Sequence, residues 1–249
     1  MIATLSSEIH SGFVSNITWN KGIEKYNLKP SDVHIWNIKV PNHFNDLFRE
    51  YRSVLNHEEF YKAKAFYWEE DFRSYLTGRI VLRILLSKYL SKSINDIRFN
   101  TEIKKPAIIS HTPLKYNLSY AGKYILISIG LCETGIDVEE VKQNFDYTDL
   151  LQACFSKEEI ACIDNNYEKS RQEFFIQWTR KEALLKYTGQ GIINDLTSIP
   201  SLNGTHKVCS EKLQLETDIN LLSFHLTSNF VGSLAYPNSV STIKYFEWQ

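Results

Sequence analysis

Two acidic residues in the segment GIDVEEV (residues 135–141), Asp137 and Glu139, have the type and spacing of a metal-binding pair. In an extended strand, side chains two positions apart point to the same face. Asp137 and Glu139 would therefore project together, while Ile136 and Val138 face the core. Carboxylate oxygens are hard ligands that Mg²⁺ prefers, together with waters and phosphate oxygens. The alternative is a solvated strand end, because a bare D-x-E pattern is common.

A third acid, Glu182, lies in the segment WTRKEALLKYTG, whose pattern is helical. On a helix, Glu182 shares a stripe with Trp178 and Leu185, being four residues after the first and three before the second. A carboxylate on such an apolar stripe needs a cation or several hydrogen bonds. The alternative is an exposed pair between Glu182 and Lys186, which would contribute only about 0.3–0.5 kcal/mol.

The elements that must position these acids alternate between strands and helices. Residues 33–40 (VHIWNIKV) are typical of a strand in which one alternating set of side chains faces inward, namely His34, Trp36, Ile38 and Val40. Residues 42–90 follow a helical pattern, and the residues 121–123 (AGK) indicate a hairpin turn before an apolar strand.

The same order of elements follows Gly135, which indicates that the chain consists of two comparable halves. Helices are predicted at residues 147–154, 156–167 and 171–187, the last ended by Gly189, and strands at residues 219–236. We therefore predict an α+β fold with an N-terminal extension (1–31), an N-terminal half (32–131) and a C-terminal half (132–249) that carries the candidate metal ligands.

Composition and charge exclude several classes of protein. The chain has 249 residues with 28 Lys and Arg against 29 Asp and Glu, so it lacks the basic excess expected of a nucleic-acid-binding protein. No apolar stretch approaches the roughly 20 residues that span a bilayer, and the first residues do not resemble a secretory signal. The four cysteines are scattered without a CxxC pair, which favours a reducing, cytoplasmic location.

Six motifs in order resemble those of the 4′-phosphopantetheinyl transferase superfamily. They are EEDFRSYLTGRIVLR, KKPAI, YNLSYAG, GIDVEEV, FSKEE and WTRKEALLKYTGQGI, and together they extend over roughly residues 62–191. The resemblance is closest to the type that activates nonribosomal peptide and polyketide synthases and consists of one chain with two similar halves. It implies a fold in which two α+β halves are related by a pseudo-two-fold axis.

The resemblance also implies roles for particular residues. Asp137, Glu139 and Glu182 match the family's metal-binding carboxylates, which would hold Mg²⁺ or Mn²⁺ against the diphosphate of coenzyme A, the co-substrate. Lys186 matches the lysine that contacts the phosphates and offsets charge on the departing nucleotide. The catalytic set implied by the resemblance is therefore Glu159, Lys186 and Glu182.

Two roles are open for Glu159. The resemblance implies that this residue is the general base that draws the proton from a serine hydroxyl of the carrier protein. Ser156 and Glu159 also fit the S-x-x-E capping box, in which the glutamate is held at the start of a helix. Both roles are compatible only if the side chain is not held at the cap.

The nucleotide of coenzyme A would be bound by several residues of the N-terminal half and by Lys186 of the C-terminal half. For Lys62 a solvated helix face is the alternative, and for Arg73 and Arg79 the alternative is an apolar stem that reaches out to solvent. Tyr120 stands where the family usually has histidine, so it cannot supply an imidazolium charge to the 3′-phosphate. Either the 3′-phosphate would be held less tightly, or Lys105 would contribute more to its binding. The residues that match nucleotide contacts are Lys62, Arg73, Lys105, Ser119, Tyr120 and Lys186.

The expected reaction transfers the 4′-phosphopantetheine arm of coenzyme A to a serine of an apo acyl or peptidyl carrier protein and releases 3′,5′-ADP. The partners expected are thus the carrier protein and coenzyme A, with no nucleic acid and no membrane, and the chain is expected to be a monomer. The alternatives are a Mg²⁺-dependent phosphodiesterase and a non-catalytic module that binds carrier proteins. The expected docking surface lies near residues 147–167, where Leu150, Leu151 and Phe155 are either surface contacts or core.

Overall fold

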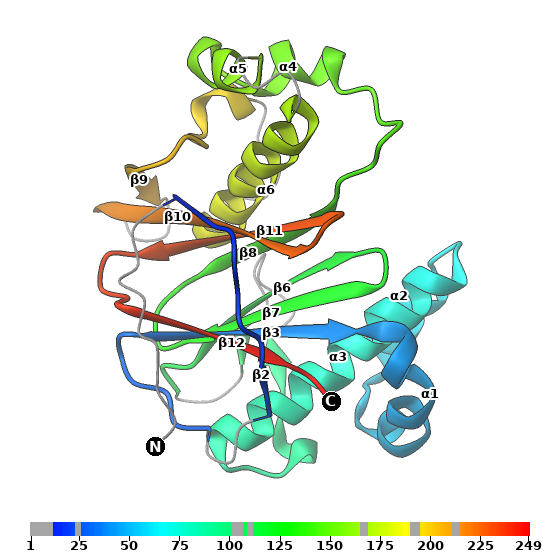
Figure 1. The fold of residues 1–249 in the computed structure, drawn as a ribbon. Helices are drawn as coiled ribbons and strands as arrows, with labels where there is room; N and C mark the ends of the chain where they lie inside the picture. Colours follow the sequence, from blue (N-terminus) through cyan, green and yellow to red (C-terminus); the bar gives the residue numbers. More distant parts are fainter. Residues whose placement is uncertain are drawn as a thin grey trace.

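The computed structural model describes residues 12–22, 26–100, 107–108, 112–164, 169–189, 195–210 and 215–249. Two mixed five-stranded sheets lie face to face, and helices cover the outer side of each sheet (Figure 1). A short third sheet pairs two strands beside the N-terminal half. No helix within these described ranges is long and apolar enough to cross a membrane.

The elements alternate along the chain as the sequence pattern predicts. The helices are α1 (Val40–Tyr51), η1 (Arg52–Val54), α2 (His57–Lys64), α3 (Glu69–Leu90), η2 (Ile94–Asp96), α4 (Thr148–Cys154), α5 (Lys157–Asp164), α6 (Ser170–Thr188) and η3 (Leu196–Ser198). The strands are β1 (Gly12–Val14), β2 (Asn20–Lys21), β3 (Asp32–Lys39), β4 (Phe99–Asn100), β5 (Ala107–Ile108), β6 (Lys115–Ala121), β7 (Tyr124–Gly130), β8 (Gly135–Glu140), β9 (Thr205–Ser210), β10 (Leu215–Thr227), β11 (Phe230–Pro237) and β12 (Thr242–Glu247).

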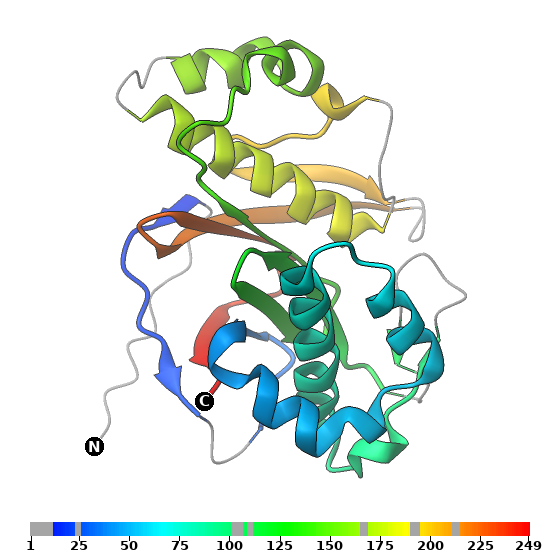
Figure 2. The same cartoon turned by 90° about the vertical axis from the view of Figure 1, so that its right-hand side faces the viewer.

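The two halves repeat one arrangement of strands and helices, which confirms the predicted two-halved α+β fold. In the N-terminal half the strands run in the order β3-β7-β6, and in the C-terminal half in the order β8-β11-β10, with antiparallel pairing throughout. In each half a strand is followed by two shorter helices and one long helix, α3 or α6. Figure 2 shows α6 lying along the strands of its own half.

The chain ends connect the two sheets. β1 pairs in parallel with β10 in the C-terminal half, whereas β2 pairs with β12, which itself pairs in parallel with β3 of the N-terminal half. The last strand of the chain therefore belongs to the sheet of the other half. The division into segments 1–31, 32–131 and 132–249 stays a prediction.

Apolar side chains pack on both faces of the strand β3. Trp36 and Ile38 pack on the side of α3, whereas Val33 and Ile35 pack between the two sheets. All residues from Asp32 to Ile38 are buried. The set beginning with His34 faces inward, as expected, but the other set is buried as well, because the strand is covered on both faces.

A shared feature at the second helix of each half is a capping box with a buried ion pair. In α2, Asn56 caps the helix with Glu59, whose carboxylate pairs with Arg79 and Arg83 of α3 at 2.6 and 2.7 Å. In α5, Ser156 and Glu159 make the same reciprocal cap, and the Glu159 carboxylate pairs with a cation of α6 at 2.7 Å. Each half thus fixes its second helix to its long helix through one buried glutamate.

Candidate active site

The candidate site lies where the edge strands of the two sheets meet, β6 of one and β8 of the other. The side-chain oxygen of Asn117 in β6 accepts a hydrogen bond from the backbone nitrogen of Ile136 in β8 at 2.9 Å. Further along the two strands, Ser119 lies beside Asp137. The strands therefore run side by side in the same direction, and each half contributes one of them.

A close approach of α6 to β8 sets the position of the acids. A Cβ atom built on Gly135 would lie 1.8 Å from the carbonyl oxygen of Ala183 and 2.5 Å from the backbone nitrogen of Tyr187. Only glycine fits at this contact, since real Cβ atoms essentially never come within 3.0 Å of such atoms. The turn of α6 pressed against Gly135 is flanked by Glu182 and Lys186, so both side chains are brought to the edge of β8.

Three side chains from three elements bond directly to one another. The Ser119 hydroxyl donates to Asp137 Oδ1 at 2.7 Å, and the Lys186 ammonium donates to the same oxygen at 2.6 Å and to the Ser119 Oγ at 2.8 Å. Asp137 is 4% exposed, whereas the Lys186 side chain is 29% exposed. The buried carboxylate is thus neutralised by the ammonium of a partly exposed side chain.

The charge of Asp137 raises the pKa of two further carboxyl groups, those of Glu139 and Glu182. Burial, followed by the charge of Asp137, raises the pKa of Glu139 to about 7, and the same two causes raise the pKa of Glu182. Lys186 opposes both shifts. We call these five residues (Ser119, Asp137, Glu139, Glu182 and Lys186) the junction cluster.

The junction cluster has the donor set for a divalent cation but not a closed coordination shell. Among the described residues, no group of three or more Asp, Glu, His or Cys side chains is arranged so that it could already hold a metal ion. Within the same part of the chain, the Oδ2 atom of Asp137 is buried without a hydrogen-bond partner. An unsatisfied buried carboxylate oxygen beside two carboxyl groups with raised pKa values fits a cation-binding role.

Glu159 lies apart from the junction cluster and is held at the start of α5. Its Oε2 accepts from the Ser156 backbone at 2.8 Å and pairs with Lys181 at 2.7 Å, and its Oε1 accepts from the Ser201 backbone and hydroxyl at 2.8 and 2.6 Å. The residue is 3% exposed. The side chain therefore occupies the capping box, and both oxygens are engaged; the base role stays a prediction that these contacts do not favour.

The expected nucleotide contacts are spread over several surfaces. Lys62 is exposed on α2, with its ammonium 5.7 Å from the ring centre of Tyr75. Arg73 is paired with Glu69 and stacks over Phe44 at 5.2 Å. Lys105 lies outside the described residues. Of the expected nucleotide contacts that the structure describes, Ser119 and Lys186 are the ones bonded within the trio with Asp137.

Tyr120, which stands in place of the family histidine, lies against α3 at Gly78. A Cβ atom on Gly78 would be 2.6 Å from the Tyr120 hydroxyl oxygen, so the ring occupies the space that glycine leaves. Burial raises the pKa of Tyr120, and the charge of Arg79 opposes this shift. Tyr120 therefore remains a neutral hydrogen-bonding group near a guanidinium.

The sequence did not predict that the Arg79 guanidinium near Tyr120 is paired with Glu59. Among the described residues, Arg79 and Arg83 share the single carboxylate of Glu59, so two positive charges there face one negative charge. Their guanidinium carbons also lie 4.4 and 4.6 Å from the ring centre of Phe99. The spacing of Asn56 and Glu59 is a capping-box pattern, and this signal indicates only that Glu59 is held at the start of α2.

The residues suggested for carrier docking belong to the core of the C-terminal half. Phe155 is 2% exposed and packs with Phe174, while Leu150 and Leu151 are partly buried against the same cluster. The alternative that these side chains are core is therefore correct for Phe155. A surface formed by α4 and α5 stays a prediction.

The fold and the site together define a class of protein with two similar halves and one site at their junction. Two similar α+β halves meet at one cluster of acids, serine and lysine, to which both halves contribute.

Comparison with known proteins identifies the family. Residues 133–235 match the model of the 4′-phosphopantetheinyl transferase superfamily, and residues 42–130 match that of the N-terminal part of 4′-phosphopantetheinyl transferases. The chain belongs to the 4′-phosphopantetheinyl transferase superfamily, a family of transferase enzymes.

Individual relatives agree with this assignment. The chain is 29% identical over 181 residues to the 4′-phosphopantetheinyl transferase HetI of Nostoc sp., a match that covers 70% of this chain and 76% of that protein. It is 27% identical over 150 residues to Sfp of Bacillus subtilis, covering 59% and 66% of the two chains. It is 35% identical over 130 residues to AcpT of Escherichia coli, covering 50% and 66%.

Proposed function

We propose that this protein transfers the 4′-phosphopantetheine arm of coenzyme A to a serine of an apo acyl or peptidyl carrier protein, with 3′,5′-ADP as the second product. The observation that carries the proposal is the bonded trio of Ser119, Asp137 and Lys186 at the junction of the halves, flanked by Glu139 and Glu182. Transfer of a phosphoryl group asks the protein mainly to position the reactants and to offset oxygen charge.

Asp137, Glu139 and Glu182 are the residues that would hold a divalent cation, Mg²⁺ or Mn²⁺. Bound there, the cation supplies charge neutralisation and polarisation of the phosphorus, which is worth several kcal/mol. The unpartnered Oδ2 of Asp137 and the raised pKa values of the two glutamates support this assignment. Metal binding requires these groups to be deprotonated, so the affinity should fall as the pH drops through about 7.

Lys186 would have one role without a bound cation and another role with a cation bound. Its ammonium neutralises Asp137 in the present arrangement at 2.6 Å. With Asp137 engaged as a cation ligand, the partly exposed Lys186 ammonium would be available to donate to phosphate oxygens and to offset charge on the leaving nucleotide. Ser119, bonded to both groups, keeps the lysine directed along β6.

The 3′-phosphate side of the nucleotide would face Tyr120 and the α3 guanidiniums. Tyr120 donates a neutral hydrogen bond, and Arg79 supplies the positive charge that an imidazolium would otherwise give. The pairing of Arg79 and Arg83 with the single carboxylate of Glu59 supports this part of the proposal. Lys62 and Lys105 stay predicted contacts.

Transfer is tested by incubating the protein with coenzyme A, Mg²⁺ and a panel of apo carrier proteins, followed by intact-mass measurement of the carriers. The proposal expects the addition of one phosphopantetheine group to a serine. Lys186→Ala should lower turnover at least about a hundredfold with a modest loss of nucleotide binding, the size of effect seen when one group that stabilises transition-state charge is removed. Lys92→Ala, an exposed lysine beyond the end of α3, is the matched control. If the wild type modifies no carrier protein, the proposed transfer reaction is overturned. If Lys186→Ala keeps full turnover, the proposed role of Lys186 is overturned.

A cytoplasmic location and a monomeric state are part of the same proposal. The structure describes the side chains of three cysteines, Cys132, Cys154 and Cys162, and all three are free thiols. Two similar halves within one chain already bring both sides of the site together, so the site needs no second copy.

A further inference from the structure

The start of β8 is held from both halves of the molecule. On one side α6 presses against Gly135, where a Cβ atom would not fit. On the other side the Asn117 side chain of β6 accepts a hydrogen bond from the backbone nitrogen of Ile136 at 2.9 Å. The hydroxyls of Ser128 in β7 and Thr134 are also bonded to each other, at 2.9 Å. Both chain neighbours of Gly135 are therefore tied to the N-terminal half.

The two ties come from one cross-strand pair. Asn117 and Ser128 stand directly opposite each other in the antiparallel pairing of β6 with β7, and we call them the seam pair. Within the described ranges, β6 pairs with β7 alone and β8 with β11 alone, so no backbone ladder joins the two sheets at this edge. Ile136 is fully buried, and its backbone nitrogen needs an acceptor. The seam pair thus makes the connection that a ladder would otherwise make.

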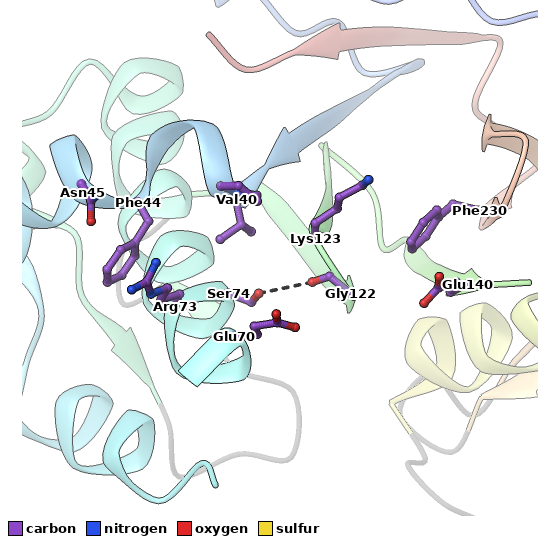
Figure 3. Close-up of a pocket in the computed structure, with 11 residues that line it drawn as sticks. Val40, Phe44, Asn45, Glu70, Arg73, Ser74, Gly122, Lys123, Glu140 and Phe230 are labelled. Atoms are coloured by element: carbon purple, nitrogen blue, oxygen red, sulfur yellow. Dashed lines mark hydrogen bonds between the residues drawn. The ribbon is translucent and has the colours of Figure 1, made fainter. Parts of the chain in front are cut away.

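The strand β6 is fixed to the helices of the N-terminal half. The Ser74 hydroxyl of α3 donates to the carbonyl of Gly122 at 3.4 Å, the bond that is drawn in Figure 3. The backbone nitrogen of Val40 in α1 donates to the carbonyl of Lys123 at 3.0 Å. The hairpin of β6 and β7 is thus held between two helices. The position of β6 against β8 therefore sets the position of the N-terminal half against the acids of β8.

A cavity of about 430 Å³ lies between the two halves at the tip of this hairpin. Figure 3 shows walls from both sides, with Val40 and Phe44 from the N-terminal half and Glu140 and Phe230 from the C-terminal half. The halves are therefore apart at the tip and joined by hydrogen bonds further back along β6. The seam pair lies in this joined part, next to the junction cluster.

We propose that Asn117 is a positioning residue, which sets the spacing between the nucleotide-binding side chains of one half and the cation-binding carboxylates of the other; this inference rests on the proposed function. Ser119 is two residues after Asn117 on β6, and Asp137 directly follows Ile136 on β8. The bond from Ile136 to Asn117 therefore brings the Ser119 hydroxyl to its place 2.7 Å from Asp137. The diphosphate of coenzyme A must meet both halves at once, so its binding depends on this spacing.

A residue with this role acts on the coupling between two ligands more than on either ligand alone. The proposed cation ligands Asp137, Glu139 and Glu182 all belong to the C-terminal half, whereas the proposed contacts of the 3′-phosphate belong to the N-terminal half. Loss of the Asn117 acceptor leaves each set intact and changes how the two sets face each other. The coupling is measured as the ratio of the Mn²⁺ Kd without coenzyme A to the Mn²⁺ Kd with it, which we call the coupling ratio.

The test is a Mn²⁺ titration of the full chain with and without coenzyme A, followed by electron paramagnetic resonance and corrected for Mn²⁺ bound to coenzyme A in buffer. Asn117→Leu removes the acceptor at nearly constant volume, and it should lower the coupling ratio at least about fivefold. Its Mn²⁺ Kd without coenzyme A should stay within about threefold of the wild type. Asn117→Asp keeps an oxygen acceptor, and its added charge shifts both Kd values in the same direction, so its coupling ratio should stay within about threefold of the wild type.

Thr112→Val is the matched control, because it also removes the acceptor of a backbone nitrogen, that of Leu114 at 3.2 Å, just before β6. Its coupling ratio should stay within about twofold of the wild type. Urea unfolding shows whether each variant is folded at the temperature of the titration. If Asn117→Leu is not folded, Asn117→Ala replaces it, because at this partly exposed position water can reach the freed nitrogen; the same fall of at least about threefold is then expected.

Each remaining outcome contradicts a stated part. A wild-type coupling ratio in the folded Asn117→Leu or Asn117→Ala variant, or an equal fall in Thr112→Val, overturns the positioning role of Asn117 and leaves the proposed function standing. A wild type whose Mn²⁺ Kd does not change with coenzyme A overturns the joint site of the proposed function, and the inference with it.

Discussion

Replacing Glu159 by glutamine, alongside the same change at Glu59, separates a structural role from a catalytic one. The two residues have equivalent places: each closes a capping box at its own second helix and pairs with a cation of its own long helix. Only Glu159 lies in the half that carries the acids of the junction cluster. Glu59→Gln is therefore an internal control for the loss of the same contacts.

The expected loss of stability follows from the contacts of each residue. Glu159→Gln keeps neutral hydrogen bonds but leaves the Lys181 ammonium, 2% exposed, without its carboxylate. Breaking a buried pair costs about 3–5 kcal/mol, and we expect about 3 kcal/mol because Lys181 retains the Leu196 and Ile199 carbonyls as acceptors. Glu59→Gln should cost at least as much, because two guanidiniums lose the same partner.

The assay pairs urea unfolding at 25 °C with turnover measured at a temperature where all proteins are folded. With an m-value near 3 kcal/mol per M, the midpoint for Glu159→Gln should fall by about 1 M. The kcat of both variants should stay within about threefold of the wild type, since neither residue has a free oxygen for a substrate proton. A general base contributes about 10²–10⁴-fold. A loss of that size in Glu159→Gln with normal turnover in Glu59→Gln would refute the structural role.

Two further predictions address the packing of α6 and the pH dependence of folding. Gly135→Ala should lower the free energy of unfolding by at least about 3 kcal/mol, because its Cβ would displace the Ala183 backbone. Turnover should fall severely, because Glu182 of α6 would be displaced as well. A free energy of unfolding equal to that of the wild type in urea would contradict this. His34 is 2% exposed, and burial lowers its pKa from 6.5 to about 4. Because the folded state binds the proton less readily than the unfolded state, about 3 kcal/mol of stability present above pH 6.5 should be lost as the pH falls to about 4. His34→Gln should lose less stability over this range than the wild type or the exposed His57→Gln, and equal losses in urea titrations would contradict the argument.

Local patterns were sufficient to predict the elements that carry the site. Gly189 ends α6 with a left-handed backbone (φ 71°), and the hairpin turn lies at Gly122 and Lys123, both as the sequence indicated. The alternation of Asp137 and Glu139 against Ile136 and Val138 also agrees with the structure, because the apolar pair lies in the core between the sheets. These features depend on neighbours within a few residues, which a sequence shows directly.

Contacts between distant segments could not be predicted in the same way. The burial of β3 on both faces depends on a second sheet, and the pairing of β12 with β3 joins residues about two hundred positions apart. The bond of Lys186 to Asp137, rather than to Glu182, depends on the approach of α6 at Gly135. The capping role of Glu159 was predicted as an alternative, but its partners Lys181 and Ser201 become visible only once α5 and α6 are packed.

The central claim is that carboxylates from β8 and α6 act on one divalent cation beside the diphosphate. The most direct test is a Mn²⁺ titration of the protein with coenzyme A, with free Mn²⁺ measured by electron paramagnetic resonance. Glu182→Gln should weaken Mn²⁺ binding by about tenfold or more, as expected for loss of a charged oxygen ligand, whereas Glu173→Gln on the same helix should stay within twofold of the wild type. Equal Mn²⁺ affinity in Glu182→Gln and the wild type would contradict the account.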